Sequence, residues 1–140
     1  YQYIRVSDMY MGGISLTDIK YVPKGAIEAI KNYKIYKDEL FISVAGTLGL
    51  VGTIPKQLDG ANLTENADKI TNIKINKNYL LEYMKSSLIQ GIIDIEKTTN
   101  AQPKLALTRI KTFPIAIPSS KEQEKISQII SSVNMNIEKT

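Results

Sequence analysis

The stretch of residues 39–55 limits most strongly what this chain can fold into. Residues 39–45 read ELFISVA, a run of apolar, β-branched and aromatic side chains typical of a buried strand. Glycines follow at positions 46, 49 and 52, and a second apolar run ends at Pro55. Glycine allows the positive φ angles of tight turns, whereas proline cannot donate to a β-ladder. The pattern therefore predicts a turn followed by a second strand, and with it a β-hairpin near the centre of the chain.

Weaker patterns predict more strands around this hairpin. Residues 3–6 (YIRV) and 69–75 (KITNIKI) have strand-like composition and partial alternation. Residues 60–66 are expected to form a polar loop. The apolar run 106–117 is broken by Pro114, so we expect it to be extended and to lie at the edge of a sheet.

Helical patterns lie on both sides of that last run. Residues 26–31 could form a short helix, and Asn76 or Asn78 could cap a longer one. The apolar stripe predicted for the longer helix is formed by Leu80, Leu81, Met84, Leu88, Ile92 and Ile95. Gly91 lowers the helix propensity of this segment.

The last segment has the strongest helical signal. Ser119 precedes Glu122 by three residues, which is a capping-box pattern at a helix start. One face then carries Ile126, Ile129, Ile130, Val133 and Ile137. Each such residue contributes about 1.5–3 kcal/mol when fully buried. We expect this face to be covered, by this chain or by a partner.

Composition excludes several classes of protein. The 140 residues contain no cysteine and no histidine, which removes disulfides, thiol chemistry, the usual zinc sites and histidine-based catalysis. No run of eighteen apolar residues and no signal-peptide pattern is present, so the expected location is cytoplasmic. The formal net charge of +4 is compatible with a polyanionic partner.

No catalytic or cofactor motif stands out. Gly46, Gly49 and Gly52 match neither the dinucleotide-binding pattern nor the Walker pattern, and a tight hairpin accounts for them better than a nucleotide site. The carboxylates show no spacing typical of acid–base pairs, and there is no Pro-Pro-Tyr or Pro-Asp sequence. We expect no catalytic residues, no metal and no cofactor.

Two polar clusters are candidates for nucleic-acid contacts. One comprises Asn62, Thr64, Glu65 and Asn66; the other comprises Thr98, Thr99, Asn100, Gln102 and Lys104. Asparagine and glutamine can pair with adenine, while lysine and threonine can hold phosphates. The alternative is that these are ordinary polar loops.

Four motifs in order resemble the target recognition domain of the specificity subunit of type I restriction–modification enzymes. They are residues 4–8 (IRVSD), 37–49 (KDELFISVAGTLG), 61–66 (ANLTEN) and the junction 102–126, which begins QPKL and ends EQEKI. The resemblance covers nearly the whole chain. The family usually has an additional N-terminal strand and a glycine-rich loop, and a longer junction helix. We therefore expect residues 1–118 to be a partial recognition domain and residues 119–140 the start of a spacer helix.

The resemblance implies an α+β fold with a twisted, mostly antiparallel sheet, one packed helix and a C-terminal amphipathic spacer helix. It also implies a non-catalytic reader of double-stranded DNA. In the family, methyltransferase subunits methylate adenine with S-adenosylmethionine, and a restriction subunit cleaves the DNA. The terminal helix would meet a second recognition domain, another copy or the methyltransferase subunits.

Combining the residues with the resemblance gives two predicted sites. The DNA-binding residues are Arg5, Ser43, Thr47, Lys56, Asn62, Thr64, Asn66, Thr98, Thr99, Asn100, Gln102 and Lys104. The partner interface is Ile126, Ile129, Ile130, Val133 and Ile137. Two alternatives remain at this point: the recognition domain of a single-chain restriction–modification enzyme, and a protein-interaction module without a DNA role, which the terminal helix alone favours.

Overall fold

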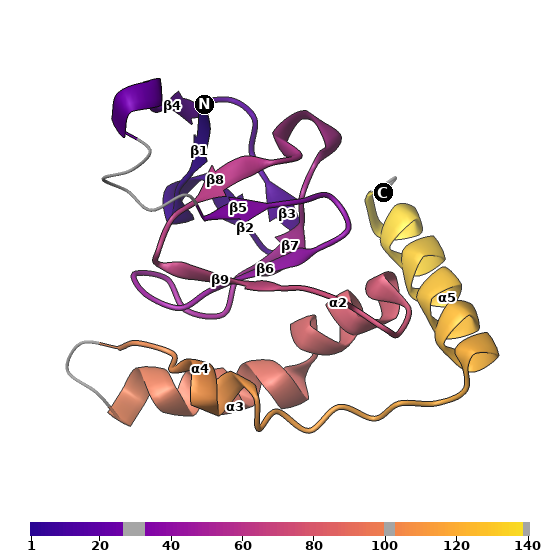
Figure 1. Ribbon diagram of the computed structural model, residues 1–140. Coiled ribbons are helices and arrows are strands. Elements are labelled where there is room, and N and C mark those ends of the chain that lie inside the picture. The colour runs from indigo at the N-terminus through magenta and orange to yellow at the C-terminus, as the bar shows by residue number, and fades with distance from the viewer. Residues whose placement is uncertain (27–32, 100–102, 139–140) are drawn as a thin grey trace.

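The computed structural model describes residues 1–26, 33–99 and 103–138, the last five by their backbone alone. Within these ranges three small sheets and four helices form an α+β fold, as predicted (Figure 1). The four-stranded sheet has the order β4 (Lys20–Tyr21), β1 (Gln2–Ile4), β8 (Ala61–Leu63) and β5 (Lys34–Ile35). The three-stranded sheet has the order β7 (Val51–Thr53), β6 (Leu40–Ser43) and β9 (Ala67–Ile70), and β2 (Met9–Tyr10) pairs with β3 (Gly13–Ile14). Pairing between these strands is antiparallel except between β1 and β8.

Strand β6 separates two hydrophobic cores. Its alternating side chains point to opposite faces. Leu40 and Ile42 enter a core closed by α2 (Lys77–Lys85) and α3 (Ser87–Thr99), whereas Phe41 enters a second core against the four-stranded sheet. All four β6 residues are buried, so the apolar run that predicted this strand reflects burial on both faces.

The central hairpin is confirmed, and its glycines have steric reasons. Leu40 pairs with Thr53 in the antiparallel ladder between β6 and β7. Gly49 has a φ of +84°, and a Cβ there would lie 2.9 Å from Ile93 Cγ2. A Cβ at Gly52 would lie 2.4 Å from the amide nitrogen of Gly13. Gly52 therefore allows the β2–β3 hairpin to pack directly against β7.

Several predicted strand limits are wrong. The expected loop 60–66 contains β8, an interior strand whose neighbours β1 and β5 come from distant parts of the chain. The strand expected at 3–6 ends at Ile4 and continues as the 3₁₀ turn η1 (Val6–Asp8), while the strand expected at 69–75 ends at Ile70. Further 3₁₀ turns are η2 (Lys24–Ala26) and η3 (Lys56–Leu58). The helix expected at 26–31 lies almost wholly outside the described residues.

The single helix expected after residue 76 is two helices. The side chain of Asn76 caps α2 by accepting the amide of Tyr79 at 2.9 Å, as predicted. Ser86 ends α2 with an extended ψ of 157° and shifts the helical phase. Beyond it the buried residues are Ile89 and Ile93, whereas Leu88 is 52% exposed and Ile95 is exposed. The predicted stripe is thus wrong at Leu88 and Ile95, whereas Ile92 is half-buried against the first core.

The edge strand predicted for 106–117 does not form. The short helix α4 (Leu107–Ile110) replaces its first part, and no described residue between 106 and 119 belongs to a strand. Local bonds satisfy the backbone at the end of α4, since the amide of Thr112 donates to the carbonyl of Arg109 and that of Phe113 to the carbonyl of Ile110. The extended remainder, which contains Pro114, crosses to the last helix (Figure 1).

The terminal helix α5 (Ser120–Glu138) packs against α2 (Figure 1). The Ser119 hydroxyl accepts the amide of Glu122 at 3.3 Å, which confirms the predicted cap. Gln123, only 4% exposed, accepts the Asn76 amide at 2.8 Å and donates to the Pro118 carbonyl at 2.8 Å. The buried side of α5 is therefore polar where it meets α2.

The isoleucine face of α5 points away from the rest of the chain. Ile126 is 37% exposed, Ile129 53% and Val133 51%. Ile130 is half-buried, and the side chain of Ile137 lies outside the described residues. In the described ranges, no helix combines the length and apolar character needed to cross a membrane.

Candidate nucleic-acid interface

Three stretches of backbone meet where β6 ends. The amides of Val44 and Ala45 donate to the carbonyl of Asn66 at 2.8 and 3.2 Å. The amide of Leu105 donates to the carbonyl of Val44 at 2.8 Å, and Lys104 forms a bridge with Ala45. This place, the β6 junction, joins three sequence motifs that are far apart along the chain.

The interior of the β6 junction consists of side chains bonded to backbone. Ser43 is fully buried, and its Oγ accepts the amide of Leu50 at 2.9 Å. Thr64 is 5% exposed, and its Oγ1 accepts the amide of Asn66 at 3.2 Å. Both hydroxyls close local turns, so the expectation that Ser43 and Thr64 face DNA does not fit their burial.

The exposed rim of the β6 junction surrounds two neighbouring hollows. Thr47, Asn66 and Lys104 are exposed on this rim. The larger hollow, of about 530 Å³, is lined by Val44, Glu65, Asp68, Lys104, Leu105, Ala106 and Leu107. The smaller hollow, of about 320 Å³, is lined by Gly46, Thr47, Leu48, Lys97 and Pro103. Predicted and unpredicted polar residues therefore share one surface.

Charges of both signs lie in these hollows. Burial raises the pKa of the Asp68 carboxyl, and the nearby positive charge of Lys104 acts in the opposite direction. Lys97, beside the smaller hollow, forms an ion pair of 3.3 Å with Asp94. The surface can thus offer cations to phosphates and carboxylate acceptors to hydrogen-bond donors.

Comparison with known proteins identifies the family. The model of the family described as type I restriction modification DNA specificity domain matches residues 1–140. The chain belongs to this family.

Solved structures agree with this identification at the level of the fold. The specificity domain is similar to the HsdS subunit from Thermoanaerobacter tengcongensis, with a TM-score of 0.78 and 15% identity over 99% of this chain. It is also similar to a chain from a structure concerned with complex assembly and conformational transition of the type I R-M system, with a TM-score of 0.71 and 15% identity over 99% of this chain. This chain spans 37% and 36% of the lengths of those two chains. No curated protein matches it.

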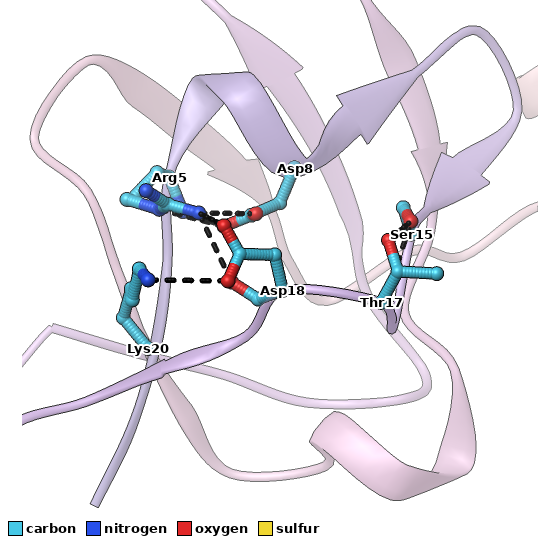
Figure 2. A network of polar contacts seen from close by, with 6 residues as sticks. All are labelled: Arg5, Asp8, Ser15, Thr17, Asp18 and Lys20. Atoms are coloured by element: carbon cyan, nitrogen blue, oxygen red, sulfur yellow. Dashed lines mark hydrogen bonds and ion pairs between the residues drawn. The ribbon is translucent and has the colours of Figure 1, made fainter.

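The first motif of the specificity domain is a separate brace on β1 and η1. Figure 2 shows the guanidinium of Arg5 between two carboxylates, with its Nη2 2.9 Å from Asp8 Oδ1 and 3.4 Å from Asp18 Oδ2. Asp8 is buried, and hydrogen bonding to it raises the pKa of Arg5. Lys20, 3.1 Å from Asp18 Oδ1, is the main cause of a lowered pKa at Asp18. Ser15 and Thr17 share a hydroxyl hydrogen bond of 2.8 Å beside this brace (Figure 2).

Asn62 departs most clearly from its predicted role. It lies on β8, is 1% exposed, and neither its Nδ2 nor its Oδ1 has a hydrogen-bond partner among the described residues. A base edge cannot reach this amide in the described conformation, so the expectation of a direct DNA contact does not fit. Its burial was not foreseen because residues 60–66 were expected to form a loop, whereas Asn62 lies on β8.

The remaining predicted residues are dispersed. Lys56 is exposed on η3. Thr98 and Thr99 are exposed at the end of α3, and both hydroxyls donate to the carbonyl of Ile95, at 3.0 and 3.1 Å. Asn100 and Gln102 lie outside the described residues.

Sequence reasoning did not include three charged residues of the rim, Glu65, Asp68 and Lys97. Glu65 belonged to the polar cluster but was not selected, and Asp68 precedes a predicted strand without any pattern of its own. Lys97, near the end of α3, lines the smaller hollow together with Thr47, which is far from it in the sequence. Among the described residues, no group of three or more acidic side chains could hold a metal ion.

Proposed function

We propose that this specificity domain is a non-catalytic reader of DNA sequence within a specificity subunit of a type I restriction–modification complex. The match of the family to residues 1–140 carries the proposal. In this function the domain directs adenine methylation and cleavage that partner subunits perform in the cytoplasm of a bacterium. The domain itself supplies recognition and no catalytic group.

The exposed rim of the β6 junction is the proposed DNA surface. Lys97 and Lys104 provide positive charge, and Thr47 and Asn66 provide groups that can contact phosphates or base edges. Backbone hydrogen bonds of the β6 junction connect the segments that carry Asn66 and Lys104. A rigid support suits recognition because less conformational freedom is lost on binding.

Residues 119–140 are the proposed start of the spacer helix, and residues 1–118 the recognition domain. The exposed isoleucine face of α5 supports a partner on that side. A shallow groove of about 440 Å³ on this face is lined by Lys125, Gln128, Ile129, Ser132 and Val133. Its proposed occupant is a helix of a second recognition domain or of another copy, in an assembly that also docks the methyltransferase subunits.

The first test replaces Lys104 by alanine in the intact protein and measures duplex binding between about 50 and 200 mM salt. Loss of one phosphate contact should make the negative slope of log K against log salt less steep by about one unit for every sequence. Lys121→Ala, an exposed lysine on α5, is the charge-matched control and should leave the slope unchanged. Absence of salt-sensitive binding by the wild-type protein would refute the DNA-reading function. An equal change of this slope in both variants would refute the phosphate contact assigned to Lys104 and leave the DNA-reading function standing.

A further inference from the structure

The larger hollow of the β6 junction contains two carboxylates that the DNA surface described above does not explain. Glu65 comes from the connection between β8 and β9, and Asp68 from β9 itself. They share a hollow of about 530 Å³ with Lys104 and with apolar side chains that include Val44 and Leu105. Carboxylates on a surface that meets phosphates oppose binding electrostatically, so attraction of the DNA backbone does not explain them.

Within the described part of the chain, the carboxylates of Asp68 and Glu65 line the hollow without a partner of their own. Among the described residues, neither carboxylate takes part in a hydrogen bond or an ion pair. Partial burial raises the pKa of the Asp68 carboxyl, and the positive charge of the neighbouring Lys104 acts in the opposite direction. In their ionised form these carboxylates only accept hydrogen bonds, so a group that they bind in the hollow has to donate one.

Base edges in the major groove differ in this respect. Cytosine presents its N4 amino group and adenine its N6 amino group, whereas guanine presents N7 and O6 and thymine presents O4 as acceptors. A carboxylate would bind either amino group and would repel an edge that offers acceptors alone. Lys104, beside Asp68, can place its charge on the adjacent phosphate.

We propose that Asp68, assisted by Glu65, makes this hollow selective for a base with an exocyclic amino group, cytosine or adenine. The proposal rests on the DNA-reading function and specifies one determinant of its sequence preference. In this role Asp68 lowers affinity for DNA in general and lowers it least for the matching base.

This role predicts that a substitution of Asp68 strengthens DNA binding in general. Asp68→Asn keeps the size of the side chain and adds a donor, so guanine and thymine become acceptable. The variant should bind DNA of unrelated sequence more tightly than the wild type. It should lose about fivefold or more of its discrimination at one base pair, because a good polar contact to a base contributes about 1–3 kcal/mol of discrimination.

The experiment selects sequences from a randomised duplex library with the intact wild-type protein, Asp68→Asn and Glu65→Gln. Asp38→Asn is the control, because Asp38 is exposed before the other end of β6 and its loss changes the net charge equally. The wild-type selection shows directly whether cytosine or adenine is preferred. Support requires that one selected position loses its amino-bearing base in Asp68→Asn and keeps it in Asp38→Asn.

Two other results would each be decisive. Equal tightening of binding in Asp68→Asn and Asp38→Asn, with sequence preference retained in both, would overturn the inference and leave the DNA-reading function standing. Absence of salt-sensitive DNA binding by the wild-type protein would overturn the function, and the inference with it. A folded state is checked for each variant by its thermal unfolding midpoint.

Discussion

The buried and exposed sides of the β6 junction use similar residues for different purposes. On the buried side, Ser43 and Thr64 bond to backbone amides and close turns. On the exposed rim, Thr47 and Lys104 have side chains open to solvent. The buried side, with its hydroxyls bonded to backbone amides, is called the frame below. A hydroxyl in a family motif can thus belong to this frame as readily as it can contact a ligand. The same motifs of this specificity domain thus contain buried residues that support the backbone and exposed residues of the proposed DNA surface, and only Asp68 and Lys97 of that surface lie outside them.

The largest effect expected from breaking the frame comes from Phe41→Ala. Phe41 is fully buried on the second core, and removing a large buried aromatic side chain costs about 3–5 kcal/mol. Urea unfolding of the intact protein measures this loss of unfolding free energy. Thr47→Ala, on the rim, should change it by less than about 0.5 kcal/mol. Similar losses of unfolding free energy in both variants would show that the rim contributes to stability as much as the frame does.

Ser43→Ala should cost about 1–3 kcal/mol of unfolding free energy, because the amide of Leu50 loses its acceptor inside the protein. Sequence preference, measured by selection from a randomised duplex library, should be that of the wild type. A change in preference without loss of stability would transfer Ser43 from the frame to the DNA surface.

The smallest effect expected, and one of opposite sign, comes from Asn62→Leu. The buried amide has no partner among the described residues, so an apolar side chain of similar shape should raise the unfolding free energy by about 1 kcal/mol. Chemical denaturation checks the sign. A loss of stability would indicate that ordered water satisfies this amide, and a loss of base discrimination would restore Asn62 as a reader.

Features set by neighbouring residues could be predicted from the sequence. The hairpin of β6 and β7 follows from apolar residues around three glycines, and the caps at Asn76 and Ser119 follow from local spacing. In contrast, β8 is a strand because β1 and β5 lie on either side of it. Its three residues, between polar neighbours, carry too little local signal to indicate that pairing.

The same difference explains what could be predicted of the candidate site. Thr47, Asn66 and Lys104 were predicted as contacts and lie together on the rim, although their roles remain proposals. Ser43, Thr64 and Asn62 have suitable chemistry, but tertiary packing buries them. Asp68 and Lys97 join the surface only through the ends of β9 and α3, which the sequence alone does not bring together.

The polar anchoring of α5 fixes its rotation about its own axis. Gln123 is hydrogen-bonded to Asn76 and Pro118, and this contact determines the direction in which Ile129 points. Each helical residue turns the chain by about 100°, so one residue inserted between Gln123 and Ile126 would rotate the isoleucine face by that angle relative to the anchor. Downstream of Ser127, insertion of whole heptads would preserve the direction of the face and only lengthen the arm. The fold therefore permits changes in the length of α5 but holds its orientation constant.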